Sequence, residues 1–146
     1  MNVFFDTSAL VKFFNVEQGT DRVTELIVNR RNRIFISELA RLEIHSAFYR
    51  KFRNHQIDTI QLNEAISGFN EQLVWFNLEG LNQLILDEAG IMLQNFGKEY
   101  GLRTLDAIHL ATFSLIAEKS WLFVCSDDIL GKVVNELGYK FINPIH

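Results

Sequence analysis

Short apolar segments alternate with longer amphipathic segments along the whole chain, and this alternation restricts the fold more than any other feature. The apolar segments cover residues 3–5, 33–36, 121–125 and 139–142. Strands that carry apolar side chains on both faces are typical of a parallel sheet covered by helices on each side. The pattern therefore predicts a three-layer α/β/α sandwich with a mostly parallel central sheet and right-handed crossovers.

The amphipathic segments predict the helices of this sandwich. We expect helices over residues 8–14, 18–30, 37–53, 59–76, 82–100 and 104–119, and a last one that ends at Leu137. Ser37 and Thr104 stand where N-caps are expected, and Gly138 stands where a left-handed C-terminal residue is expected. The chain has no internal repeat and no linker, so residues 1–146 are expected to form a single domain.

Composition and charge narrow the class of protein. Hydrophobic residues make up 48% of the chain and charged residues 22%, which is typical of a globular protein. No apolar run approaches the roughly 20 residues that span a bilayer, and no secretion signal is evident. With a single cysteine, which excludes an internal disulfide, these features predict a cytoplasmic protein without a membrane segment.

Basic residues gather in one part of a chain whose net charge is −4. That net charge argues mildly against nucleic-acid binding, since nucleic-acid-binding domains are usually basic. Residues 30–53 nevertheless hold half of the Lys and Arg side chains, namely Arg30, Arg31, Arg33, Arg41, Arg50, Lys51 and Arg53. The cluster has two interpretations, a solvated helix face or an edge that faces phosphates.

Acidic residues follow two of the predicted strands. Asp6 ends the first strand, and Asp127 and Asp128 follow the strand over 121–125. A single Asp in this position is usually only a helix N-cap. Because the carboxyl ends of parallel strands meet at one edge of the sheet, two such positions on different strands predict a site there.

Two more acids belong to predicted helices. Glu43 shares its helix face with apolar and small residues and has no charged partner there, whereas Glu38 lies beside Arg41 and His45. An unpaired buried carboxylate is costly, so we interpret Glu43 as a candidate ligand and Glu38 as a solvated residue. Asp106 lies in the first turn of an apolar helix, where it either complements the helix dipole or faces a polar site.

A cluster of carboxylates without grouped Cys or His is a hard-oxygen site. Such a site suits Mg²⁺ or Mn²⁺ and not zinc, and its natural chemistry is phosphodiester hydrolysis. We expect His109 to be a packed helix residue with one satisfied nitrogen. We expect Cys125 to be a small core residue.

The residues that carry these features resemble the motifs of PIN-domain nucleases. Asp6-Thr7-Ser8-Ala9-Leu10 resembles the opening motif, and residues 36–47 resemble the second motif with Glu43 at its acidic position. Residues 105–111 resemble the third motif and give the most specific match. Residues 123–127 resemble the fourth, although Cys125 stands where the family usually has Thr or Ser. The closing strand of the family resembles residues 139–144.

The short single-domain form resembles the VapC-like toxins of toxin–antitoxin pairs. This resemblance implies a Mg²⁺- or Mn²⁺-dependent endoribonuclease that cuts RNA, forms a homodimer and is inhibited by an antitoxin. It also implies that Asp6, Glu43, Asp106 and Asp127 are the catalytic and metal-binding residues, with Ser8 as a supporting group. Asp128 stays open as an alternative or supporting acid. We expect six aromatic residues of the middle helices to offer the antitoxin a groove, namely Phe48, Tyr49, Phe52, Phe69, Trp75 and Phe76.

Other classes fit the residues less well. A haloacid-dehalogenase-like phosphatase needs a second Asp where this chain has Ser8, and a receiver domain needs paired acids after its first strand. The alternative that stays open is a PIN fold without a toxin role, either an RNA-processing enzyme or a protein that only binds RNA or a partner.

Overall fold

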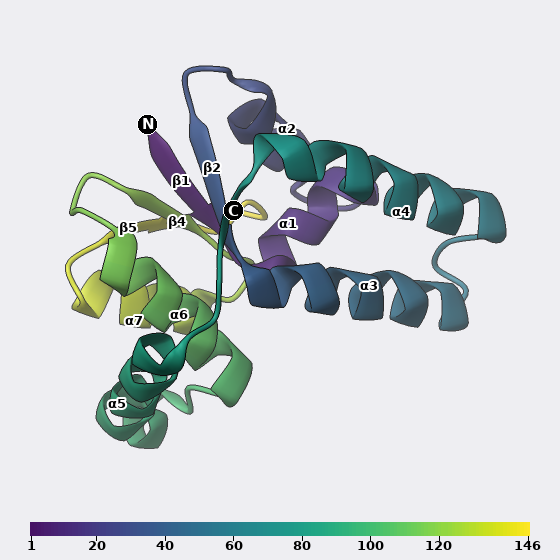
Figure 1. Ribbon diagram of the computed structural model, residues 1–146. Coiled ribbons are helices and arrows are strands. Elements are labelled where there is room, and N and C mark those ends of the chain that lie inside the picture. The colour runs from purple at the N-terminus through teal and green to yellow at the C-terminus, as the bar shows by residue number, and fades with distance from the viewer.

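A computed structural model describes residues 1–146 and contains a five-stranded sheet. Helices cover both faces of this sheet (Figure 1). The strands are β1 (Asn2–Phe5), β2 (Arg33–Ser37), β3 (Asn77–Glu79), β4 (Leu122–Val124) and β5 (Lys140–Ile142). Their order in the sheet is β3-β2-β1-β4-β5, and every neighbouring pair is parallel. The predicted α/β/α sandwich is therefore confirmed, with a sheet that is wholly parallel.

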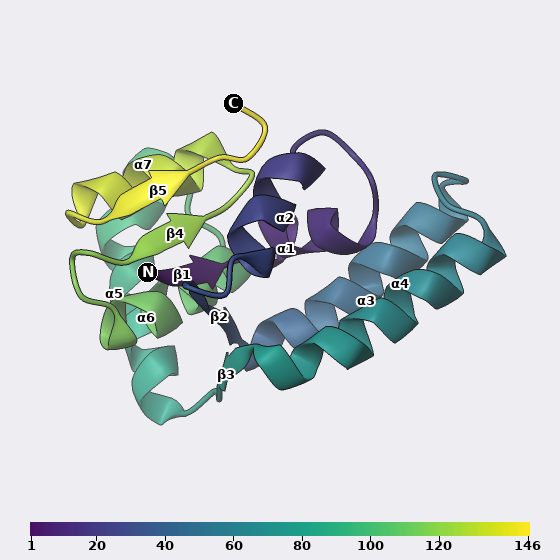
Figure 2. The ribbon, with the colours of Figure 1, turned by 90° about the horizontal axis from the view of Figure 1, so that it is seen from above.

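The helices divide between the two faces of the sheet. They are α1 (Thr7–Phe14), α2 (Thr20–Val28), α3 (Glu38–Arg53), α4 (Thr59–Gln72), α5 (Gln83–Tyr100), α6 (Thr104–Ile116) and α7 (Asp128–Glu136), with a short 3₁₀ helix η1 (Leu73–Trp75) after α4. Helices α1 to α4 contribute to one hydrophobic core, and α5 to α7 contribute to the other. The view from above separates these two layers (Figure 2).

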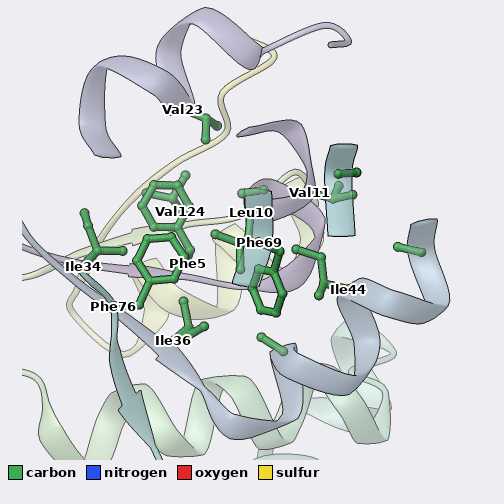
Figure 3. Packing of buried hydrophobic residues seen from close by; sticks show 14 of the residues in the cluster. Phe5, Leu10, Val11, Val23, Ile34, Ile36, Ile44, Phe69, Phe76 and Val124 are labelled. Carbon is green, nitrogen blue, oxygen red and sulfur yellow. The ribbon is translucent and has the colours of Figure 1, made fainter. Parts of the chain in front are cut away.

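Alternation along the strands builds the two cores. Val3 and Phe5 of β1 pack into the core under α1 and α3, while Phe4 between them packs with Phe113 and Phe123 on the other face. Figure 3 shows the first core, where the side chain of Phe5 lies among residues of β2, β4 and the covering helices. Since both faces are buried, the strands are apolar throughout, as the sequence indicates.

The strands end together, and this places the residues that follow them side by side. Phe5 of β1 is in register with Ile36 of β2 and with Val124 of β4. The backbone N–H of Asp6 extends the β1–β4 pairing with a 3.1 Å hydrogen bond to the carbonyl of Val124. The residues that follow β1 and β4 therefore lie at one edge of the sheet.

The structure adds one strand to the sequence-based prediction and moves several helix ends. The helix predicted over 59–76 ends at Gln72, and after η1 the chain forms β3 beside β2. This edge strand holds one apolar residue, Leu78, between Asn77 and Glu79, so it gives no apolar run to detect. Thr104 is the first residue of α6 and not its cap, because Arg103 occupies the N-cap position without a side-chain hydrogen bond.

Helices α3 and α4 form an antiparallel pair that projects beyond the sheet (Figure 2). The capping box of Asp58 and Gln61 starts α4 after the turn at the far end of this pair. Elsewhere, Gly138 has φ +86° after α7, the left-handed conformation expected there. No helix is both long and apolar enough to cross a membrane.

Candidate active site

The edge of the sheet where β1 and β4 end carries the predicted acids. Asp6 follows β1 as the N-cap of α1, and Asp127 is the N-cap of α7 just after β4. Asp106 lies in the first turn of α6, and Glu43 lies on α3, which starts directly after β2. Four segments that are distant in the sequence thus contribute one carboxylate each.

Asp6 is the most buried of these acids, with 4% of its surface exposed. Its Oδ1 accepts hydrogen bonds from the Ser8 hydroxyl at 2.7 Å and from the Ala9 backbone N–H at 3.1 Å. Burial raises the pKa of Asp6 to about 6, although His109 and these hydrogen bonds lower it, and the charge of Asp106 adds to the increase. Asp6 therefore lies in an environment that disfavours the charged form of its carboxylate.

Asp106 is half-buried beside its own helix end. Its Oδ2 lies 3.5 Å from Nε of Arg103, which is largely exposed. Burial raises the pKa of Asp106, the charge of Arg103 lowers it, and the charge of Asp127 raises it again. The charge of Asp106 acts on Asp6 and the charge of Asp127 acts on Asp106, so Asp106 lies close enough to both for like charges to repel.

The two adjacent acids after β4 have different environments. Oδ1 of Asp127 accepts the backbone N–H groups of Ile129 at 2.8 Å and Leu130 at 3.2 Å, which leaves Oδ2 without a partner in the protein. Asp128 uses both oxygens, one for Asn143 at 3.0 Å and one for His146 at 3.2 Å. The hydrogen bond from Asn143 is the main reason that the pKa of Asp128 lies below its ordinary value.

Glu43 is not unpaired, and this part of the sequence-based argument is wrong. Its helix indeed offers no charged partner, but other elements do: the Thr7 hydroxyl donates to Oε1 at 2.9 Å, and Nε2 of His109 contacts the same oxygen. Burial raises the pKa of Glu43, and the contacts with His109 and Thr7 outweigh that effect and lower it. Glu38, in contrast, pairs with Arg41 on the same helix.

These four carboxylates share a pattern that also occurs in exposed acids such as Asp58, so their common place at the sheet edge, and not the pattern alone, sets them apart. Each has one oxygen held by the protein and one without a hydrogen-bond partner there: Oδ2 of Asp6, Oε2 of Glu43, Oδ1 of Asp106 and Oδ2 of Asp127. Asp128 and Glu17 have both oxygens engaged. A carboxylate fixed through one oxygen offers the other as a well-oriented ligand.

This donor set fits a hard cation. Carboxylate oxygens are the ligands of Mg²⁺ and Mn²⁺, and a divalent ion would offset the burial and the weaker repulsion that together raise the pKa of Asp6 and Asp106. No three His, Cys, Asp or Glu side chains lie close enough to enclose one ion by themselves. Mg²⁺ does not require such an enclosure, since it is usually bound through one or two carboxylates and keeps several waters.

Ser8 and Cys125 complete the edge between β1 and β4. The Ser8 hydroxyl donates to Asp6 and accepts the Ser126 backbone N–H at 3.0 Å, so it links the segments that carry Asp6 and Asp127. Cys125 is fully buried, as expected, and its thiol donates to the Asp127 carbonyl at 3.3 Å. Burial and the neighbouring carboxylates raise the pKa of this thiol, which disfavours a thiolate nucleophile.

Sequence reasoning missed the roles of Thr7 and His109. His109 is buried with one contacted nitrogen, as predicted, but the contact reaches Glu43 and not the core. The two partners of Glu43 lie 36 and 66 positions away, so periodicity along one helix could not reveal them. The only signal was their place within the motif segments that hold Asp6 and Asp106.

The basic segment divides into two parts. Arg33 starts β2 in register with Asn2, so Arg30, Arg31 and Arg33 lie at the opposite end of the strands from the four acids. The other basic residues of the segment lie on α3, the helix that carries Glu43. The cluster is therefore not one continuous phosphate-facing edge beside the site.

Comparisons with known proteins agree with this arrangement. The sequence profile of the PIN domain matches residues 3–133. Ribonuclease VapC46 of Mycobacterium tuberculosis is 29% identical over 142 residues, which are 97% of each chain.

Two solved structures share the fold. VapC20 of Mycobacterium tuberculosis, a sarcin-ricin loop cleaving toxin, gives a TM-score of 0.73 at 14% identity and covers 97% of this chain and 99% of its own. A toxin-antitoxin complex from Klebsiella pneumoniae gives 0.61 at 22% identity, with 97% of each chain covered. The resemblance in the sequence motifs is confirmed, and this chain belongs to the PIN domain family.

Proposed function

We propose that this protein is a divalent-metal-dependent endoribonuclease and the toxin of a toxin–antitoxin pair. The observation that carries the proposal is the set of four carboxylates at one sheet edge, each with one oxygen fixed and one free. The similarity to ribonuclease VapC46 over 97% of both chains supports RNA as the substrate.

The side chains of the site would have different roles. Asp6, Glu43, Asp106 and Asp127 would supply ligands through their free oxygens, no more than two of them to any one ion, and waters would complete the coordination. A bound Mg²⁺ or Mn²⁺ would lower the pKa of a coordinated water and stabilise the leaving oxygen of the phosphodiester. Ser8 keeps Asp6 oriented and ties its segment to that of Asp127. Asp128 stays outside the site, engaged with the C-terminal residues.

Metal removal tests the enzymatic part of the proposal. We expect the purified chain to cleave RNA with Mg²⁺ or Mn²⁺ and to lose this activity in excess EDTA, because carboxylates alone do not activate water for this reaction at neutral pH. Adding Mg²⁺ or Mn²⁺ in excess over the chelator should restore cleavage, whereas Ca²⁺ at the same concentration serves as a control. Sustained cleavage in excess chelator would contradict metal dependence.

A groove away from the carboxylates supports a protein partner. The end of α2, the start of β2 and η1 enclose about 330 Å³, lined by apolar residues (Ile27, Val28, Ile34, Trp75 and Phe76) and by polar ones (Asn29, Arg30, Asn32 and Gln72). Trp75 is 67% exposed and Val28 60%, and the Arg30 guanidinium lies 5.8 Å from the centre of the Trp75 ring. A groove that combines apolar side chains with amides and one arginine fits an amphipathic helix whose apolar face is flanked by polar and acidic residues.

The aromatic groove expected from the sequence is wrong in part, because three of its six side chains are buried. Of the six aromatic residues, Phe48, Phe69 and Phe76 belong to the core, while Tyr49, Phe52 and Trp75 stay exposed. Of these six aromatic residues, only Trp75 and Phe76 line the groove. Since solved relatives include toxin-antitoxin complexes, we infer that the antitoxin binds here. The homodimer and the cytoplasmic location stay predictions.

Co-expression with the product of the adjacent gene tests the partner. We expect a stable complex with suppressed RNA cleavage, and we expect the double variant Val28→Asp, Trp75→Ala to lose the complex and keep nuclease activity. Ile91→Asp, which changes an exposed apolar residue of α5, is the matched control and should still bind. A chain that is harmless when expressed alone and binds no such product would favour an RNA-processing role instead.

A further inference from the structure

A buried imidazole contacts one of the four carboxylates. His109 of α6 is 2% exposed, and its Nε2 lies against Oε1 of Glu43 on α3. The Thr7 hydroxyl of α1 donates to the same oxygen at 2.9 Å and lies 3.4 Å from Nε2. Three helices therefore meet at one carboxylate oxygen.

Packing alone gives no reason for a histidine at this buried position. Its neighbours on α6, Ala107, Leu110 and Ala111, are fully buried and apolar. Nδ1 is buried with no hydrogen-bond partner, and an unsatisfied buried nitrogen is unfavourable and rare. All polar contacts of the ring are thus made by Nε2, with Glu43 and Thr7.

We propose that His109 and Thr7 are positioning residues that fix Oε1 of Glu43 and so direct Oε2 toward the metal; this inference rests on the proposed function. A glutamate side chain has three rotatable bonds, and a ligand that is free to rotate binds a cation less tightly than an oriented one. Two donors on one oxygen restrict that rotation and leave the second oxygen available. Hydrogen bonds to ligands commonly contribute in this way to metal affinity.

Pairs of variants separate positioning from packing. His109→Leu removes the donor, whereas His109→Gln places an N–H donor near the position of Nε2. Thr7→Val removes the hydroxyl at constant shape, and Thr7→Ser keeps it. Thr112→Val is the matched control, because Thr112 is as buried on α6 but its hydroxyl donates to the Ile108 carbonyl, away from Glu43.

Mn²⁺ binding to the purified protein without RNA gives the readout, with free Mn²⁺ measured by electron paramagnetic resonance. We expect His109→Leu to weaken binding about 10–100-fold and Thr7→Val about tenfold. His109→Gln and Thr7→Ser should stay within about threefold of the parent, and Thr112→Val should match it. In RNA cleavage, the same two weakened variants should recover much of their rate at high Mn²⁺, unlike Glu43→Gln.

Three other outcomes would each show which part of the proposal is wrong. If His109→Leu and Thr7→Val stay folded and bind Mn²⁺ as the parent does while Glu43→Gln binds weakly, the positioning role is wrong and the proposed function stands. If His109→Gln fails as badly as His109→Leu while both keep the melting temperature of the parent, a donor at Nε2 is not what matters. If the parent itself binds no Mn²⁺, the proposed function fails.

Discussion

RNA cleavage is expected to fall about a thousandfold when an amide replaces any one of four carboxylates, those of Asp6, Glu43, Asp106 and Asp127. A metal-bound site contributes several kcal/mol of transition-state stabilisation, and about 4 kcal/mol corresponds to about a thousandfold in rate. The amide keeps the shape of the side chain, and Asn caps a helix as well as Asp does, so α1 and α7 should stay folded. Initial rates on a labelled RNA at saturating Mg²⁺ measure the effect.

The adjacent acid provides the matched control. Asp128→Asn makes the same chemical change one position after Asp127, but both oxygens of Asp128 are engaged with Asn143 and His146. We expect this variant, like Glu38→Gln, to cleave within a few-fold of the parent. Loss of cleavage in Asp128→Asn with retention in Asp127→Asn would reverse the assignment of the fourth acid.

The metal-free protein is expected to become more stable at neutral pH when Asp6 is replaced by Asn. The pKa of Asp6 lies at about 6 in the folded protein against 3.8 for an ordinary Asp, so the folded chain keeps this proton to a higher pH than the unfolded chain. The free energy of unfolding therefore decreases as pH rises from about 4 to about 6. Above pH 6 the loss is complete and amounts to about 3 kcal/mol, which Asp6→Asn should remove.

Thermal unfolding in EDTA at several pH values measures this difference. At pH 7.5 the variant should melt roughly 6–12 °C above the parent, and the gap should close toward pH 4. Added Mg²⁺ should stabilise the parent more than the variant, because ligand binding favours the folded state. Asp128→Asn should not stabilise the protein, since its pKa is lowered. Equal melting of parent and Asp6→Asn at pH 7.5 would refute the argument.

The sequence alone predicted those parts of the site that depend on strand ends. Asp6 and Asp127 follow apolar runs, and parallel strands bring such residues to one edge whatever the details of packing. The layers of the fold were predictable for the same reason, since strands buried on both faces leave continuous apolar runs. Edge strand β3 was not predicted, because only one of its three residues has an apolar side chain. A hydrogen bond from the Asn77 side chain to the Ile34 carbonyl anchors it instead.

What the sequence could not give were the contacts between elements. Helical periodicity finds neighbours three or four positions apart, whereas Glu43 takes its partners from α1 and α6. The choice between Asp127 and Asp128 likewise depends on residues near the C-terminus that bind only one of them. The motif resemblance pointed to Asp127, and the hydrogen bonds give an independent physical reason for that preference.

The order of the strands has a consequence for how the chain acquires its activity during synthesis. Central strand β1 is made first, but its partner β4 begins only at Leu122, and the acid Asp127 follows Asp6 after 121 positions. Closing so distant a pair is slow, because a long loop must be ordered before the contact forms. A nascent chain that stops before residue 122 lacks both strand β4 and the acid Asp127. The groove between α2, β2 and η1 is lined only by residues up to Phe76, so all of its lining residues are synthesised well before Asp127.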